Sequence, residues 1–377
     1  MIWSFITFIV RKFDPETAHQ ISLNALKFGI HPRLKFIKIP TRINNLIFKN
    51  ILGVAAGFDK NAEVIKNIHY LNFGFTEVGT ITPLPQYGNA KPRVFRLEDD
   101  QAIINRNGFN NLGMNQAKIK LEKYRKQFPV GGDFIMGINI GPNKDSPDRF
   151  RDYEVLSQNL AKFADYITIN ISSPNTPNLR EFHNKELLGK VIKSVKKGIS
   201  NSESSLMQLP IFLKIAPDIS NENLETIVHT ANKLKITGLI ISNTTIDRNE
   251  TLKSKNSIEI GGLSGKPLFY KSTTILCLAN KIIKQNNYKL YLIAAGGVSD
   301  AKTTYAKILC GADLVQLYSS MTFKGPLIAD NIIRGLLELM KRDKVKAIED
   351  VRGISHNPEE AMQIASKGLN FSIGNKK

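Results

Sequence analysis

The chain has 377 residues, 42% of them hydrophobic and 23% charged, a balance that suits a large folded core and excludes a disordered protein. Its formal net charge is +19, but the lysines are spread among acidic residues without a nucleic-acid motif, so we expect no nucleic-acid partner. The two cysteines, Cys277 and Cys310, form no CxxC pair and no cluster with histidine, which argues against a disulfide scaffold and against a metal site.

The first 40 residues are expected to form a separate helical segment. The run "MIWSFITFIV" (1–10) is too short to span a bilayer, which needs about 20 apolar residues, and it lacks the flanks of a signal peptide. Apolar residues at helical spacing from Pro15 onward predict one helix, and a second short helix is expected after Pro32. Such helices could anchor the protein at a membrane surface or pack on its own body, and both alternatives stay open.

From about residue 50 the chain carries eight short apolar runs separated by helical patterns such as 221–235 and 300–310. The runs are continuous rather than alternating, which is typical of parallel strands buried on both faces. We expect strands at 50–56, 74–80, 133–140, 165–171, 210–216, 237–243, 291–297 and 312–318.

Eight strand–helix units predict an α/β fold, a (β/α)8 TIM barrel over residues 41–340, with an open doubly wound sheet as the alternative. No GxGxxG follows the first strand, which counts against a dinucleotide-binding form of that alternative. Residues 341–377 are expected to add a C-terminal helix, "NPEEAMQIASKGL", and a loose tail.

Polar, glycine-rich and proline-rich sequences follow the expected strands, for example "GFDKNAE", "SSPNTPN" and "NTTIDR". In a barrel these ends meet on one face, which predicts a lined pocket there. Two of the ends, "AAGG" (294–297) and "YSS" (318–320), follow the seventh and eighth strands, where barrels commonly bind a phosphate. The segment "GGLSGKP" (261–267) has the wrong spacing for a P-loop, so we expect no nucleotide hydrolysis.

Two lysines lie at strand ends, Lys60 after the first strand and Lys214 within "IFLKIA". A lysine in an apolar strand cannot point unpaired into a dry core without a large cost, so Lys214 should meet an anion at the barrel mouth. A reduced flavin ring is one such anion, and a carboxylate such as Asp218 is the alternative. Amide and hydroxyl side chains that suit a small carboxylated amide share this mouth: Asn105, Asn139, Asn170, Asn175, Asn243 and Thr244.

Long motifs in this sequence resemble one known family. They are "AAGFDKNAE" (55–63), "PRVFR" (92–96), "NRNGFNN" (105–111), "NISSPNTPNLR" (170–180), "KIAPD" (214–218), "SNTT" (242–245), "GGLSGKPL" (261–268) and "GADLVQLYSSMTFKGP" (311–326). Together they are similar to dihydroorotate dehydrogenase of the membrane-associated, quinone-dependent class, over residues 15 to 326. Asn178 departs from the family pattern, which commonly has glycine there.

The resemblance implies that FMN is the cofactor and that (S)-dihydroorotate is oxidised to orotate in pyrimidine (UMP) biosynthesis, with electrons passed to a membrane quinone. The implied flavin contacts are Ala56, Gly57, Thr80, Asn139, Asn170, Lys214, Ser242, Gly265, Gly297, Tyr318 and Ser319. The implied substrate contacts are Lys60, Asn105, Arg106, Asn107, Gly108, Phe109, Asn170, Asn175, Asn243 and Thr244.

The resemblance also implies catalytic roles. Ser173 matches the family's catalytic base, with a proton relay through Thr176 screened by Phe109, whereas the soluble classes use a cysteine as base. His19, Arg96 and Tyr318 match positions that line the quinone tunnel. The protein is expected to be a monomer bound peripherally through its N-terminal helices to the cytoplasmic face of the cell membrane.

Two rival functions stay open at this point. One is an FMN barrel reductase that uses NAD(P)H, and the other is a basic, non-catalytic protein that binds nucleic acid or membranes. Flavin absorbance at about 450 nm would exclude the second rival, and the choice of electron acceptor would decide about the first.

Overall fold

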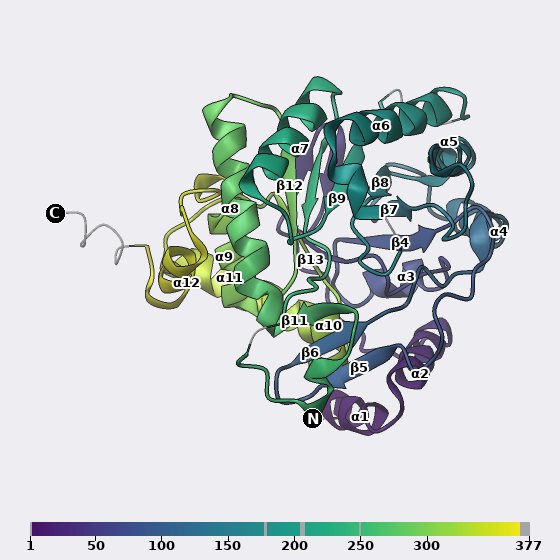
Figure 1. Cartoon of the computed structure of the whole chain (residues 1–377). Helices are drawn as coiled ribbons and strands as arrows, with labels where there is room; N and C mark the ends of the chain where they lie inside the picture. The colour runs from purple at the N-terminus through teal and green to yellow at the C-terminus, as the bar shows by residue number, and fades with distance from the viewer. Residues whose placement is uncertain (1, 177–178, 204–207, 249, 370–377) are drawn as a thin grey trace.

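The computed structural model describes residues 2–176, 179–203, 208–248 and 250–369, so that Asn178 and the expected tail lie outside the described residues. Eight parallel strands close into a barrel in chain order, with the last strand paired to the first (Figure 1). The predicted (β/α)8 barrel is therefore confirmed. The barrel strands are β3 (Leu52–Val54), β4 (Phe75–Ile81), β7 (Ile135–Ile140), β8 (Tyr166–Asn170), β9 (Ile211–Ile215), β10 (Gly238–Ile241), β12 (Tyr291–Ala295) and β13 (Leu314–Leu317).

A helix that covers the outer face follows each barrel strand, and after β13 the short helix α10 (Ser319–Lys324) comes before it (Figure 1). Apolar side chains of these helices, such as Leu188 and Ile227, are fully buried against the strands. The eight helices are α3 (Ile65–His69), α4 (Gly113–Arg125), α5 (Arg149–Leu160), α6 (Lys185–Ser200), α7 (Asn221–Lys233), α8 (Phe269–Gln285), α9 (Ala301–Leu309) and α11 (Ile328–Arg342). The expected C-terminal helix is present as α12 (Pro358–Lys367), and α11 runs across the predicted boundary at residue 340.

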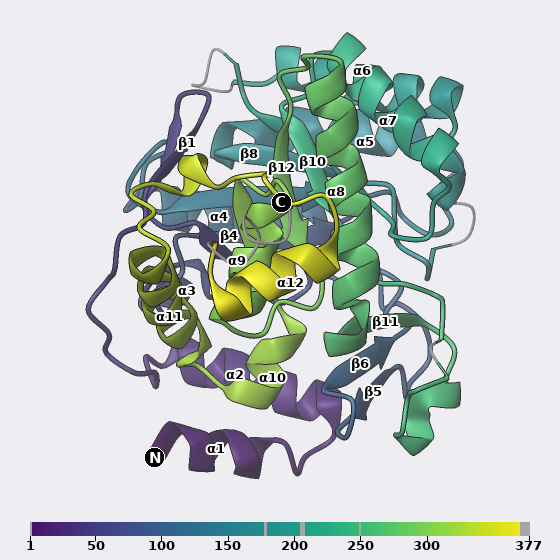
Figure 2. The same cartoon turned by 90° about the vertical axis from the view of Figure 1, so that its left-hand side faces the viewer.

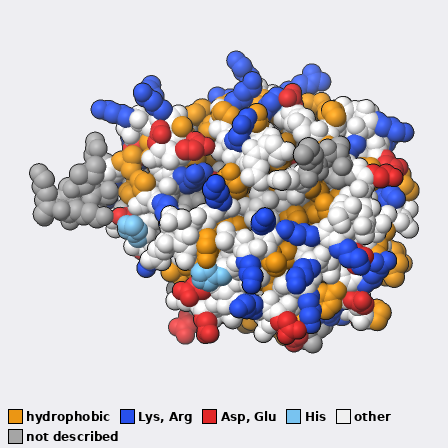
Figure 3. All heavy atoms as spheres, turned by 90° about the horizontal axis from the view of Figure 1, so that it is seen from above, with side chains coloured by type: hydrophobic (Ala, Val, Ile, Leu, Met, Phe, Trp, Pro, Cys, Tyr) orange, Lys and Arg blue, Asp and Glu red, His pale blue; other side chains and the backbone are white. Residues whose placement is uncertain are grey.

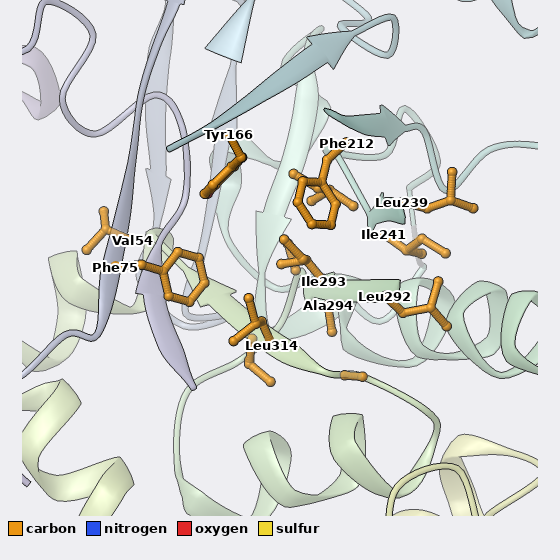
Figure 4. Close-up of a cluster of buried hydrophobic side chains, with 14 of the residues drawn as sticks. Val54, Phe75, Tyr166, Phe212, Leu239, Ile241, Leu292, Ile293, Ala294 and Leu314 are labelled. Carbon is orange, nitrogen blue, oxygen red and sulfur yellow. The ribbon is translucent and has the colours of Figure 1, made fainter. Parts of the chain in front are cut away.

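Aromatic rings fill the amino-terminal end of the barrel. In three pairs of adjacent strands, a glycine of one strand lies opposite an aromatic residue of the other: Gly53 and Phe75, Gly137 and Tyr166, Gly238 and Phe212. A Cβ added at each glycine would lie 2.1–2.9 Å from neighbouring atoms, among them atoms of the opposite ring. Glycine is therefore required at these positions for the rings to lie inward. Figure 4 shows these three rings grouped inside the barrel. The rings of Tyr166 and Phe212 meet edge to face, with their centres 5.3 Å apart.

Short additional strands lie outside the barrel. The antiparallel hairpin β1 (Thr41–Ile43) and β2 (Leu46–Phe48) closes the amino-terminal end, where Phe48 packs edge to face on Phe75 at 5.2 Å. Near the carboxyl-terminal end, β5 (Val94–Leu97), β6 (Ala102–Asn105) and β11 (Gly262–Gly265) form a three-stranded antiparallel sheet. None of these five strands was predicted from the sequence.

The N-terminal segment is helical, and the helix predicted from Pro15 onward is confirmed as α2 (Pro15–Lys27). α1 (Ile2–Val10) and α2 lie beside each other near β5, β6 and α10, as both Figure 1 and Figure 2 show. The helix expected after Pro32 is absent, which makes that prediction wrong. The segment around Ile37 is extended because Asn72 Oδ1 accepts from its N–H and Asn50 Nδ2 donates to its carbonyl.

No helix of the described residues is long and apolar enough to cross a membrane. On the face seen in Figure 3, which looks down on the end of the molecule opposite α1 and α2, lysine and arginine side chains are spread among acidic and hydrophobic ones. The positive charge is thus distributed over this face rather than gathered into one patch.

Candidate active site

Above the aromatic rings, the inward-facing positions of the barrel become polar. Side chains alternate along a strand, so the position two residues after Phe75, Tyr166 or Phe212 faces inward again. These next positions are Glu77, Thr168 and Lys214. The buried Glu77 carboxylate accepts hydrogen bonds from four donors: Asn139 Nδ2 (2.7 Å), Thr168 Oγ1 (3.0 Å), Gln316 Nε2 (3.1 Å) and Tyr166 OH (3.2 Å).

The next layer consists of amides at the carboxyl ends of β7 and β8. Asn170 Nδ2 donates to Thr80 Oγ1 (3.0 Å) and to Asn139 Oδ1 (3.2 Å), and Thr80 Oγ1 donates to Asn139 Oδ1 (2.6 Å). Because Asn139 also donates to Glu77, one network fixes the side chains of three predicted flavin contacts. The carboxylate deep in the barrel therefore sets the geometry of the mouth.

A cavity of about 740 Å³ opens at this end of the barrel and extends to α1 and α2. This volume is ample for a cofactor together with small substrates. The cavity brings together most of the residues predicted for the site. They are Ala56, Gly57, Lys60, Thr80, Asn105, Asn107, Gly108, Phe109, Asn170, Ser173, Asn175, Lys214, Ser242, Asn243, Thr244, Gly265, Gly297, Tyr318 and Ser319, together with His19 and Arg96 at the end toward the N-terminal helices.

Three predicted site residues do not line this cavity. Asn139 supports Thr80 and Asn170 from beneath them. Arg106 is bound elsewhere, with its guanidinium paired to Glu259 (2.7 Å) and lying over the Phe95 ring, 4.5 Å from the ring centre. Thr176 is buried, and its Oγ1 has no hydrogen-bond partner in the part of the chain that the structure describes.

The loop after β8 carries Ser173 and is braced by charged and amide side chains. Arg180 spans three loops, donating to the Asp218 carboxylate (2.9 Å), to the Thr244 carbonyl (3.2 Å) and to the Ser172 carbonyl (3.4 Å). Among the described residues, the Ser173 hydroxyl only accepts a weak bond from the Asn175 backbone N–H (3.3 Å) and donates none. Ser173 Oγ lies at the cavity wall, where its proton can meet a ligand.

Lys214 is buried at the cavity, and burial lowers its pKa while the charge of Glu77 opposes that change. Its ammonium forms no hydrogen bond or ion pair within the described residues. The alternative pairing with Asp218 is wrong, because that carboxylate pairs with Arg180 and with Lys271 (2.8 Å). A buried cation that faces a cavity without a partner suits an anionic cofactor edge such as that of FMN, so the residues present fit this group.

Lys60 and His19 lie on the path between the two ends of the cavity. Burial lowers the pKa of Lys60 to about 8. Burial and the nearby Lys60 charge lower the pKa of His19 to about 3, so its imidazole is neutral at physiological pH. The His19 ring packs at 5.4 Å on Phe58 and at 6.1 Å from Tyr318, which joins α2 to the strand ends.

Two arginines of β5 and its approach fasten the N-terminal helices to the barrel. Arg93 forms an ion pair with Glu16 of α2 (2.9 Å). Arg96 donates to the carbonyls of Arg11 and Phe13 just after α1, where a helix end leaves carbonyls without partners. Strand β5 therefore fixes where both helices lie over the cavity.

A (β/α)8 barrel with a cavity at the carboxyl ends of its strands, lined by lysines, amides and hydroxyls, defines an enzyme for small polar, anionic compounds. Comparison with known proteins narrows this class. The sequence model described as dihydroorotate dehydrogenase matches residues 38–340, and the chain belongs to that family.

Curated relatives and solved structures agree with this family. The chain is 44% identical over 349 residues to a dihydroorotate dehydrogenase (quinone) of Bartonella tribocorum, covering 92% of this chain and 94% of the relative. It is 45% identical over 344 residues to that of Rhizobium leguminosarum bv. trifolii, covering 90% and 92%. A ligand-free DHODH crystal structure from Eimeria tenella superposes with a TM-score of 0.86 at 36% identity, covering 92% of this chain and 100% of that one.

Sequence reasoning missed three residues that organise the site: Glu77, Arg93 and Arg180. For Glu77 a signal was available, because it interrupts the apolar run "GFTEVGT" just as Lys214 interrupts "IFLKIA". For Arg93 and Arg180 the signal was weak, since arginines in loops and short strands are usually solvated.

Proposed function

We propose that this protein oxidises (S)-dihydroorotate to orotate with FMN as cofactor and passes the electrons to a membrane quinone, as a step of pyrimidine (UMP) biosynthesis. The observation that carries the proposal is that one continuous cavity joins a polar end at Ser173, Lys60 and Lys214 to an apolar end at α1 and α2. A polar acid and a lipophilic electron acceptor need such different surroundings. The names of the family and of its curated relatives indicate which compounds these are, dihydroorotate and a quinone.

The residues at the polar end have distinct roles in this proposal. Lys60 binds the substrate carboxylate, and the amides of Asn105, Asn107, Asn175 and Asn243, with the Thr244 hydroxyl, hold the ring amide groups. Asn105 and Asn175 are already joined, since Asn175 Nδ2 donates to the Asn105 carbonyl at 3.1 Å. The substrate is thereby oriented before any bond breaks.

Ser173, whose hydroxyl lies at the cavity wall, takes the proton from the substrate carbon next to the ring carbonyl and gives up its own hydroxyl proton in the same step. The buried Thr176 hydroxyl, which lacks a partner in the described residues, relays that proton, and Phe109 screens the route from solvent. FMN, when bound, accepts the hydride and delivers the electrons to quinone. Lys214 places a positive charge beside the flavin. The other flavin contacts at the cavity are Ala56, Gly57, Thr80, Asn170, Ser242, Gly265, Gly297, Tyr318 and Ser319.

We also propose that α1 and α2 rest on the cytoplasmic face of the cell membrane and that the protein is a monomer bound there peripherally. The outer face of α1 carries Ile2 (68% exposed), Phe5 (65%) and Phe8 (50%), followed by Arg11 and Lys12. Large apolar groups flanked by basic residues favour the interface of an anionic bilayer. Its inner residues, among them Trp3, Ile6 and Val10, line the cavity, so a quinone could pass directly from the bilayer.

The test uses the purified full-length protein. We expect a yellow protein whose absorbance at about 450 nm is bleached by dihydroorotate and restored by a short-chain quinone. Reoxidation by NAD⁺ but not by quinone would favour the rival NAD(P)H-linked reductase, and a colourless protein that binds no flavin would contradict any flavin function. Flotation with anionic vesicles, compared with a variant that lacks residues 1–13, tests the membrane contact.

A further inference from the structure

Lys307 of α9 is a fully buried lysine that has no role in the proposed chemistry. It forms no ion pair within the described residues, and no carboxylate is among the groups that act on its charge. Its ammonium instead donates to Ser272 Oγ of α8 (2.7 Å) and lies over the Phe269 ring, 5.2 Å from the ring centre. A buried cation without a counter-ion is costly unless an anion arrives, so its place in the molecule needs an explanation.

Lys307 lies directly behind the glycine turn that follows β12. Ser272 Oγ accepts from Lys307, and its own proton lies between the carbonyls of Gly296 and Phe269, each 3.1 Å away, so that one hydroxyl separates the ammonium from the Gly296–Gly297 peptide group. The turn packs closely on α8 and the residues before it, because a Cβ on Gly296 would lie 2.9 Å from atoms of Leu268 and Ser272, and a Cβ on Gly297 would lie 2.3 Å from Phe269 Cα. Both glycines have positive φ, 98° and 76°.

The orientation of this peptide aims a donor into the cavity. In a trans peptide the carbonyl of one residue and the N–H of the next point in opposite directions. With the Gly296 carbonyl held toward Ser272, the Gly297 N–H points the other way, toward the cavity that both glycines line. The N–H groups of Gly297 and Val298 donate to no group of the described residues, and successive free amides at glycines of positive φ form an anion-binding nest.

We infer that Lys307 is a positioning residue for the phosphate of the cofactor: through Ser272 it fixes and polarises the Gly296–Gly297 peptide and supplies the buried positive charge that balances the phosphate. The inference rests on the proposed FMN function. It adds an electrostatic contribution from a residue that does not itself line the cavity. A charge transmitted along a chain of hydrogen bonds strengthens the terminal donor.

The titratable groups around Lys307 allow a sharp test by pH. Burial lowers the pKa of Lys307 to about 7. Two side chains interact electrostatically with the Lys307 ammonium: Cys277 on α8 and Cys310 at the end of α9. The pKa of Cys310 is raised by its hydrogen bond with Cys277, by burial and by the charge of Glu360 on α12. Cys310 is therefore a neutral thiol. Since the phosphate prefers the charged lysine, FMN affinity should fall as pH rises above about 7 and Lys307 loses its proton.

The experiment compares Lys307→Met with Lys302→Met, which removes an exposed lysine from the same helix and changes the net charge equally. FMN dissociation is measured by flavin fluorescence on serial dilution of the full-length holoprotein from about pH 7 to about pH 9. We expect Lys307→Met to weaken FMN binding roughly ten- to hundredfold at pH 7 and to make the decline toward pH 9 shallower than in wild type, whereas Lys302→Met should match wild type. Ser272→Ala should give a smaller loss and keep the decline.

The outcomes separate this inference from the proposed function. If wild type retains FMN and Lys307→Met binds it equally well, the inference is overturned and the proposed function stands. A weaker Lys307→Met complex whose affinity still declines with pH as in wild type would mark a packing role and would also overturn it. If wild type binds no FMN, the proposed function fails and takes the inference with it.

Discussion

Glu77 offers a quantitative test of how the barrel interior supports the site. We predict that Glu77→Ala destabilises the protein by about 4 kcal/mol, whereas Glu77→Gln costs less than about 2 kcal/mol. The carboxylate is fully buried and accepts four hydrogen bonds, two of them from the side-chain amides of Asn139 and Gln316. The other two come from hydroxyls, which can rotate toward different acceptors.

The size of each stability loss follows from the hydrogen-bond donors that the variant leaves without an acceptor. Alanine leaves the two amide N–H groups buried without an acceptor, at about 1–3 kcal/mol each. Glutamine keeps the shape, and a turned Gln316 amide can accept from it, because Gln316 Oε1 has no partner within the described residues. Lys214 loses its nearby carboxylate in both variants, so this contribution cancels in the comparison.

Urea unfolding followed by circular dichroism measures the difference between the two variants, with flavin content recorded in parallel. We expect Glu77→Ala to lose flavin as well, since Asn139 then no longer holds Thr80 and Asn170 in place. Equal stability of the alanine and glutamine variants would show that the network contributes no hydrogen-bond energy, and our reasoning about the layer beneath the site would be wrong.

Three further predictions concern the proposed reaction. Ser173→Ala should keep its flavin but turn over dihydroorotate about 10²–10⁴ times more slowly, and an unchanged rate at every pH would contradict its role as base. The KM for dihydroorotate should rise above about pH 8, because the substrate carboxylate needs protonated Lys60, whose pKa is lowered to about 8. Lys60→Arg should flatten this rise in KM, since arginine keeps its charge; a rise that persists in this variant would point to another group. Removal of residues 1–13 should spare flavin reduction by dihydroorotate and abolish reoxidation by a long-chain quinone, measured in stopped flow; intact reoxidation would leave α1 a purely structural role.

The barrel was predictable because its signal is local. Each barrel strand is a buried, largely apolar run, and seven of the eight lie within the ranges expected from the sequence, while β4 ends one residue beyond its range, at Ile81. The sheet of β5, β6 and β11 carries no such signal. Its strands are four residues long, and Ala102 pairs with Gly265, far along the chain, so their partnership depends on the finished barrel.

Residues of the candidate site could be predicted where the side chain faces the cavity, and could not be predicted where the side chain binds another side chain. Lys214 follows from the cost of burying a charge, and the same reasoning applied to "GFTEVGT" would have found Glu77. Arg106 shows the opposite error: it lies within a motif whose neighbours line the cavity, yet its side chain turns away to Glu259. A contiguous motif does not determine which of its side chains face the cavity.

The N-terminal helices set the chemical character of the end of the cavity that they cover. Charged groups there are already engaged, since Arg96 is bound to the carbonyls that follow α1 and Arg93 to Glu16. Two polar residues add neutral surface: the pKa of His19 is far below physiological pH, and burial raises the pKa of Tyr318. His19, Phe58 and Tyr318 pack against one another along the cavity, so a lipophilic acceptor meets uncharged rings beside charged groups that already have partners. In the proposed reaction, two substrates of opposite polarity can therefore use one cavity without competing for the same surface.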